Sequence, residues 1–152
     1  MRLYRIGSAL FPVFDGTGAA RAGGRWNGPG RPVIYCAHSL ACCQLETLVH
    51  IGRAAPPTNH LWIEIDVPDG IAATTLTAAT LPAGWDDPLR LDVSQAIGDR
   101  WLASADTAIL RVPSVAAHGD WVVALNPLHP DFASMTASTA RPLTWDARLF
   151  RA

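Results

Sequence analysis

The segment LWIEIDV (residues 61–67) alternates strictly between apolar and polar side chains. Leu61, Ile63, Ile65 and Val67 fall on one side, and Trp62, Glu64 and Asp66 fall on the other. A period of two predicts a strand with one buried face and one polar face. It is the clearest strand in the chain, and a strand needs partners, so the fold must be built on a sheet.

Other short strands are predicted on both sides of this segment. The candidates are RLYRIG (residues 2–7), PVIYCA (32–37), AILRVP (108–113), WVVALNP (121–127) and PLTWDARLF (142–150). AILRVP and WVVALNP are expected to form a hairpin across residues 114–120. Only SLACCQLETLVHIG (39–52) and VSQAIGDRWLAS (93–104) are typical of helices. Because several strands follow one another directly, we predict an α+β fold with mixed, mainly antiparallel sheets and few helices.

The two predicted helices have recognisable ends and faces. Ser39 is a suitable N-cap for the first helix, and Gly52 stands where a C-cap glycine belongs. The apolar face of the first helix is expected to carry Ala41, Leu45, Leu48 and Val49, and that of the second Val93, Ile97 and Trp101.

Length and composition favour one domain covering residues 1–152, because 152 residues with 49% hydrophobic and 16% charged residues can bury a core without metal or disulfides. The three cysteines, at positions 36, 42 and 43, do not make a disulfide framework and favour a reducing cytoplasmic setting. The first residues resemble a signal peptide only weakly, since Pro12 and Asp15 interrupt the apolar run. No apolar run approaches the roughly 18 residues that a membrane span requires.

All twelve basic residues are arginines, and the formal net charge is −1. The absence of lysine excludes a Schiff base, a P-loop lysine and a lysine general base, whereas bidentate guanidinium contacts to phosphate or carboxylate remain available. The charge balance also lacks the basic footprint of a nucleic-acid binder, so no direct nucleic-acid partner is expected.

The stretch AGGRWNGPGRPVIY (residues 22–35) contains the end of a long glycine-rich loop, residues 8–31, and the start of the strand predicted after it. Long ordered loops inside a small domain are commonly functional. Two glycines beside Arg25 allow the backbone to bring its guanidinium close to a ligand, for which phosphate or carboxylate is the natural partner. The alternative is a surface arginine on a mobile loop.

Two further side chains have both a structural and a functional interpretation. Tyr35 ends a strand and is either a core residue or a ligand contact with a polar tip. Glu46 lies in the middle of the first helix, either as a surface carboxylate paired with His50 at i+4 or as a carboxylate directed into a cleft.

Ser114 and Asn126 both follow strands, and each could form a hydrogen bond to a ligand. Ser114 lacks the Gly-x-Ser-x-Gly elbow of a serine nucleophile. A metal site is disfavoured, because Cys36, His38, Cys42, Cys43 and His50 do not have the spacing of a zinc set. The GTGAAR segment (residues 16–21) lacks the third glycine of a Rossmann fingerprint.

Taken in order, seven segments resemble the RES-domain toxins of bacterial toxin–antitoxin modules. They are LYR (residues 3–5), GGRWN (23–27), VIYCAHS (33–39), LETLVH (45–50), GDRWL (98–102), LRVPS (110–114) and LNPLHPDF (125–132). The resemblance extends from residue 2 to about residue 149 and is therefore far more specific than any single segment.

The resemblance implies a fold like that of the ADP-ribosyltransferase toxins and a reaction on NAD+. In that family the arginine of GGRWN, the tyrosine ten residues later and the glutamate on the following helix form the polar set of the active site. The matching residues here are Arg25, Tyr35 and Glu46, and Ser114 matches the serine of the VPS motif. Arg5 matches an early arginine that faces the dinucleotide in this fold.

These residue types suit cleavage of the bond between nicotinamide and ribose, whose transition state has oxocarbenium character. A fixed carboxylate, here Glu46, stabilises that positive charge. Arg25 and Arg5 are expected to hold the pyrophosphate and Tyr35 to offer an aromatic face. Ser114 and Asn126 would orient the amide or ribose, while Trp26 and Asn27 shape the loop wall.

We therefore expect a toxin for which NAD+ is the substrate, acting as a glycohydrolase or phosphorylase without a metal cofactor. Transfer of ADP-ribose to a protein is the alternative within enzymes, and a non-enzymatic nucleotide-binding regulator is the alternative outside them. A nuclease is disfavoured by the charge balance. The resemblance further implies a small Xre-family antitoxin as partner, and a homodimer stays open as a second assembly.

Overall fold

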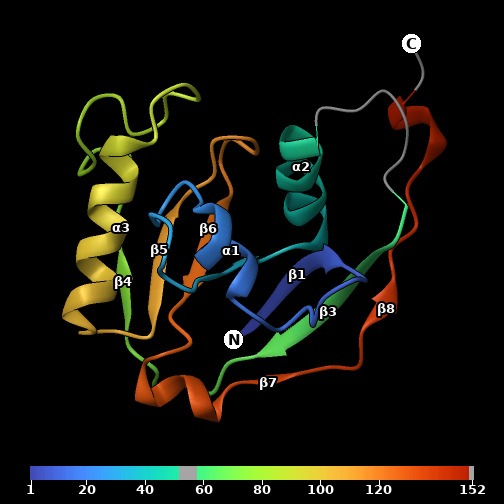
Figure 1. Ribbon diagram of the computed structural model, residues 1–152, viewed down its shortest axis with the longest axis horizontal. Coiled ribbons are helices and arrows are strands. Elements are labelled where there is room, and N and C mark those ends of the chain that lie inside the picture. The colour runs from blue at the N-terminus through green and yellow to red at the C-terminus, as the bar shows by residue number, and fades with distance from the viewer. Residues whose placement is uncertain (52–57, 151–152) are drawn as a thin grey trace.

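The computed structural model describes residues 1–51 and 58–150, and within them eight strands form one sheet (Figure 1). Its strands run in the order β4-β5-β6-β2-β1-β3-β7, and β8 pairs with β3 beside β7. The strands are β1 (Arg2–Ser8), β2 (Ile34–Ala37), β3 (His60–Asp66), β4 (Ala73–Thr75), β5 (Ile109–Pro113), β6 (Trp121–Leu125), β7 (Thr136–Ala137) and β8 (Arg141–Pro142). Every pairing is antiparallel except that of β4 with β5. The predicted α+β class with a mainly antiparallel sheet is confirmed.

Three α-helices accompany the sheet in the described residues: α1 (Thr17–Ala22), α2 (Leu40–Ile51) and α3 (Asp92–Ser104). Two short 3-10 helices, η1 (Pro130–Ser134) and η2 (Ala147–Phe150), lie near the C-terminus. Figure 1 shows α3 beside the β4–β5 end of the sheet, with α2 over the other half. Helix α2 packs against β1 and β2, and Figure 1 shows α1 in front of the sheet between α3 and α2.

The core is divided into two main clusters by the two faces of the sheet. One cluster contains Leu3, Ile34, Cys36, Ile63, Ile65, Ile109, Val123 and Leu125 among its buried residues. The other contains Trp26, Val33, Trp101, Leu110, Val112 and Ala124. The alternation predicted for residues 61–67 is correct, since Ile63, Ile65 and Val67 are buried while Asp66 is exposed. The predicted hairpin of β5 and β6 is also confirmed, with Pro113 opposite Trp121.

The buried face predicted for α2 is wrong. Leu45 and Val49 are 43% and 66% exposed, and the buried residues of the helix are Cys42 and Cys43. The thiols are small enough to let the helix approach the sheet, and the Cys43 thiol donates a hydrogen bond to the Tyr4 carbonyl at 3.0 Å. Leu45 and Val49 of the periodic pattern are therefore left exposed.

The N-cap predicted for α2 and the packing predicted for Trp101 and Ile97 of α3 agree with the structure. The Ser39 hydroxyl accepts a hydrogen bond from the Cys42 N–H at 3.1 Å, as an N-cap does. Gly52, the predicted C-cap, lies outside the described residues. Trp101 of α3 is buried, with Ile97 packed against the same cluster, as predicted.

The strand predicted for residues 142–150 is also wrong. Only Arg141 and Pro142 pair with β3, and η2 follows. The Asp146 carboxylate accepts a hydrogen bond from the Arg148 N–H at 2.9 Å, and this local bond turns the chain away from extended pairing. The short elements α1 and β4 were not predicted.

Candidate active site

A cavity of about 440 Å³ opens between α1, α2 and the sheet. This volume is in the range of small-molecule sites. The lining residues are Arg5 and Ile6 of β1, Gly18, Ala19, Gly23, Gly24, Arg25 and Trp26 of α1 and the loop after it, Tyr35, Cys36 and Ala37 of β2, Cys43, Glu46, Thr47, His50 and Ile51 of α2, His60 of β3, and Pro113, Val115 and Val122 of the β5–β6 hairpin. The structure therefore brings Arg5, Arg25, Trp26, Tyr35 and Glu46 to one cavity.

Arg25 is held at the cavity by a loop far away in the sequence. Its Nη1 donates hydrogen bonds to the carbonyls of Trp85 at 3.1 Å and Asp87 at 3.2 Å. Within the described residues its Nε and Nη2 make no hydrogen bond, so these donors are available to an anion. Sequence reasoning missed this contribution of residues 85–87, because backbone carbonyls leave no side-chain signature.

The loop that carries Arg25 is organised around the side chain of Asn27, which is fully buried. Its Nδ2 donates to the carbonyls of Ala19 and Arg31, both at 2.9 Å. Its Oδ1 accepts a hydrogen bond from the Tyr35 hydroxyl at 2.6 Å. Asn27 therefore shapes the loop from within and does not line the cavity.

Helix α3 supports the same loop from the side opposite the cavity. Gln95 Nε2 donates to the Gly24 carbonyl at 2.9 Å, and Asp99 Oδ1 accepts from the Gly28 N–H at 2.9 Å. At Gly98 the contact is so close that an added Cβ would lie 1.8 Å from the Trp26 carbonyl oxygen. The helix thus fixes the backbone on both sides of Arg25.

Tyr35 joins the loop to the sheet. Its hydroxyl donates to Asn27 and accepts from the Trp26 N–H at 3.0 Å. Burial raises the pKa of the Tyr35 hydroxyl well above its ordinary value, so the group stays neutral and can donate. Tyr35 is also one of the residues that line the cavity.

Glu46 of α2 contacts Ser114, the residue after β5, although the two are 68 positions apart in the chain. The Ser114 hydroxyl donates to Glu46 Oε1 at 2.6 Å and accepts from the Ala117 N–H at 2.8 Å. Sequence reasoning offered His50 as a possible partner for the Glu46 carboxylate, but the His50 ring bonds the Glu46 backbone carbonyl instead. The carboxylate is therefore held toward the cavity by the β5–β6 turn.

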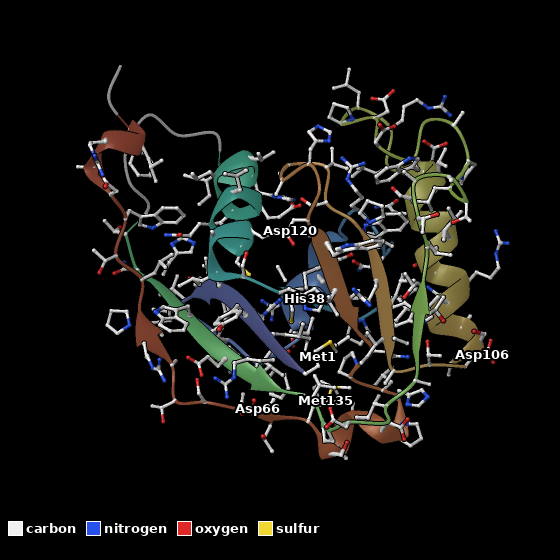
Figure 2. All side chains as sticks on the ribbon, turned by 180° about the vertical axis from the view of Figure 1, so that it is seen from behind. Met1, His38, Asp66, Asp106, Asp120 and Met135 are labelled. Atoms are coloured by element: carbon white, nitrogen blue, oxygen red, sulfur yellow. The ribbon has the colours of Figure 1, made fainter. Side chains whose placement is uncertain are left out.

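Asp120 fixes that turn against the start of α2. Its carbonyl accepts from the Ser114 N–H at 3.0 Å, and its Oδ2 accepts from the Ser39 hydroxyl at 3.4 Å. Figure 2, from behind, shows Asp120 between α2 and the β5–β6 hairpin. This residue ties the helix that carries Glu46 to the turn that carries Ser114.

Arg5 contributes a buried positive charge to the cavity wall. Its guanidinium donates to the carbonyls of Val13 at 2.6 Å, Tyr35 at 3.0 Å and Asp15 at 3.1 Å. Burial lowers the pKa of Arg5 from its ordinary value, but an arginine remains a cation at neutral pH. Arg5 therefore holds the loop after β1 and adds to the positive potential of the cavity.

Three predicted site residues, Asn27, Ser114 and Asn126, are not among the lining residues, and within the described part of the chain Asn126 also makes no hydrogen bond with the side chains of the site. It follows β6 at the end opposite Ser114, where its N–H donates to the Ala108 carbonyl at 2.9 Å. Its Oδ1 accepts from the Leu128 N–H at 3.0 Å. Asn126 shapes the turn after β6.

Within residues 1–51 and 58–150, no three His, Cys, Asp or Glu side chains lie close enough together to hold a metal ion. None of the helices in this part of the chain has the length and apolar character needed to cross a membrane.

Known proteins resemble this chain over almost its whole length. The model of the RES domain matches residues 2–146. A Prs ADP-ribosylating toxin from a Sphingobium species is 39% identical over 139 residues, which are 90% of this chain and 86% of the relative. A protein named Toxin Res from Pseudomonas putida is 34% identical over 99% of this chain and all of its own length.

A solved structure is similar over almost the whole fold. The crystal structure of the M. tuberculosis MbcT–MbcA toxin–antitoxin complex contains a chain that aligns with a TM-score of 0.74 and 27% identity. The alignment covers 98% of this chain and 86% of that one. From the family match, the relatives and the shared fold, this chain belongs to the RES-domain family.

Proposed function

We propose that this protein is the toxin of a toxin–antitoxin module and that it cleaves NAD+ between nicotinamide and ribose, passing ADP-ribose to water or phosphate. The observation that carries the proposal is the convergence of Arg25, Tyr35 and Glu46 on one cavity. The names of the relatives and of the solved complex, which describe toxins and an antitoxin partner, support it.

The anionic part of the substrate fits the cationic side of the cavity. Arg25 keeps Nε and Nη2 for the pyrophosphate, while the carbonyls of residues 85 and 87 fix its Nη1. Arg5 adds a second, buried charge. Bidentate guanidinium contacts give both affinity and orientation for phosphate oxygens.

Glu46 supplies the electrostatic stabilisation of the reaction. As the C1′–N bond breaks, nicotinamide leaves as a neutral group and positive charge develops on the ribose. A carboxylate already held in place by Ser114 stabilises this charge without reorganising. No activated nucleophile is required for departure of the leaving group.

The test is the release of nicotinamide from NAD+ by the purified protein and by Glu46→Gln. We expect the variant to lose about 100-fold or more in kcat, as when a preorganised electrostatic group is removed. Glu64→Gln is the matched control, because Glu64, on β3, lies outside the cavity lining and interacts with Arg2 and Arg141. Full turnover in Glu46→Gln would refute the assignment.

A protein acceptor is the second candidate, because the relative with 39% identity is named an ADP-ribosylating toxin. The dinucleotide pocket would be the same for both reactions, and the acceptor differs. Incubation with labelled NAD+, with and without phosphate or cell lysate, separates them: free ADP-ribose or its phosphate supports the first candidate, and labelled protein the second. NAD+ binding without any product would instead identify a nucleotide-binding regulator.

The proposed partner is an antitoxin of the Xre family whose binding occludes the cavity. A toxin that consumes NAD+ must be restrained in the cell that makes it. Co-purification of the two proteins, with loss of nicotinamide release in the complex, tests this pairing.

A further inference from the structure

His50 lies in the cavity wall but has no part in the steps described so far. It follows Glu46 by one turn of α2, at position i+4, so both side chains project from the same face of the helix. Its Nδ1 is 2.7 Å from the Glu46 carbonyl oxygen. The ring is exposed, so it stands where the cavity meets solvent.

This hydrogen bond fixes the tautomer of the His50 ring. A carbonyl oxygen can only accept, so Nδ1 must carry the proton that it donates. In the neutral ring Nε2 is then left with a lone pair. A cavity-lining histidine whose Nδ1 is oriented by a hydrogen bond and whose Nε2 keeps a lone pair can act as a general base.

When the acceptor is water or a hydroxyl group, the proposed reaction needs such a base after nicotinamide departs. A water or hydroxyl acceptor that attacks C1′ must lose a proton. Glu46 is poorly suited to take it, because its carboxylate is bonded to Ser114 and its negative charge stabilises the ribose cation. A proton on Glu46 would cancel that charge while it is needed.

We propose that His50 is a further catalytic residue, the base that takes the proton of the acceptor; this rests on the proposed cleavage of NAD+. The C1′–N bond breaks and nicotinamide leaves with its electron pair. The acceptor oxygen forms the new bond to C1′, its proton passes to Nε2 of His50, and bulk water later takes that proton. The acceptor enters at the solvent-exposed side of the cavity while the dinucleotide fills the rest.

Azide distinguishes this role from a structural one, because it attacks carbon without losing a proton. His50→Gln should form ADP-ribose from NAD+ and water about 100-fold more slowly than the unchanged protein. Its rate of forming the azide adduct should be unchanged, so the ratio of azide adduct to ADP-ribose should rise by the same factor. His129→Gln is the matched control, since His129 lies outside the cavity lining and its Nδ1 accepts a hydrogen bond from the Asp131 N–H at 3.1 Å.

A second variant gives an independent measurement. His50→Ala should regain formation of ADP-ribose when free imidazole is added, because a small base can occupy the space that the side chain leaves. Equal loss of both products in His50→Gln, no loss of either, or no rescue by imidazole would overturn the role of His50. Release of no nicotinamide by the unchanged protein with either acceptor would overturn the proposed function, and this inference with it.

Discussion

The hydroxyl of Tyr35 is bonded on both sides by buried groups of the loop that carries Arg25. Tyr35→Phe would leave the Trp26 N–H and Asn27 Oδ1 without this partner. Because buried polar groups without partners are costly, we expect the free energy of unfolding to fall by about 1–3 kcal/mol. Urea denaturation followed by tryptophan fluorescence measures it.

The control for this prediction is the other tyrosine of the chain. Tyr4 makes no hydroxyl hydrogen bond within the described residues, so Tyr4→Phe should change stability by less than about 0.5 kcal/mol. Equal effects of the two substitutions would mean that the Tyr35 hydroxyl does not hold the loop.

Arg25 and Glu46 each have a structural interpretation from the local pattern alone, and the ordered resemblance along the chain is what predicts a shared site. Both residues line the cavity. The prediction that Asn126 belongs to the same site as Ser114 is inconsistent with the predicted hairpin. Residues after the first and second strands of a hairpin lie at opposite ends of the pair, so Ser114 and Asn126 could not share one site through this hairpin.

At the scale of elements, the packing of α3 on the Arg25 loop depends on Gly98. A methyl group there would meet the Trp26 carbonyl oxygen, which is backbone and cannot rotate away. Gly98→Ala should therefore destabilise the protein by about 1–3 kcal/mol or more and raise the KM for NAD+, because the helix must move away from the loop. Thermal unfolding and nicotinamide release measure the two effects.

Gly18 in α1 offers a matched helical glycine with open space around it. Alanine at position 18 should leave stability unchanged or raise it by up to about 1 kcal/mol, through helix propensity alone. A Gly98→Ala protein as stable as Gly18→Ala would show that the close contact does not constrain α3.

The elements themselves differ in how far their sequence determines them. The alternation in β3 specifies both its type and its buried face, because a strand has only two faces. In α2 Leu45 and Val49 belong to the predicted apolar face but are exposed, since the two small thiols allow closer approach to β1 and β2. Residues 142–150 alternate like a strand, but the Asp146 carboxylate accepts a hydrogen bond from the Arg148 N–H and forms a local turn.

For the whole molecule, buried thiols predict a loss of stability at alkaline pH. Burial raises the pKa of Cys36 from 9.0 to about 12, and that of Cys42 likewise to about 12. The fold thus keeps the thiol protonated, whereas the unfolded chain releases the proton above pH 9. Stability from Cys36 is complete below pH 9 and is lost as pH rises toward 12, at up to ~1.4 kcal/mol per pH unit.

Urea unfolding at several pH values between 8 and 11 measures this dependence. Cys36→Ala should have a flatter profile above pH 9, although it starts from lower stability because of the space left in the core. Parallel profiles for the two proteins would show that the Cys36 thiol does not contribute.

During synthesis of the chain the cavity can form only late, because β2 lies between β1 and the much later strand β6. β2 belongs to the first quarter of the chain, but its neighbour β6 and the hydroxyl that holds Glu46 come from residues 114–125. A chain that is still being synthesised therefore has an incomplete cavity around Arg5 and Arg25 until the β5–β6 hairpin has been made and has folded. If the chain consumes NAD+, abandoned translation products would be harmless to the cell that made them, and the restraining protein need recognise only finished molecules.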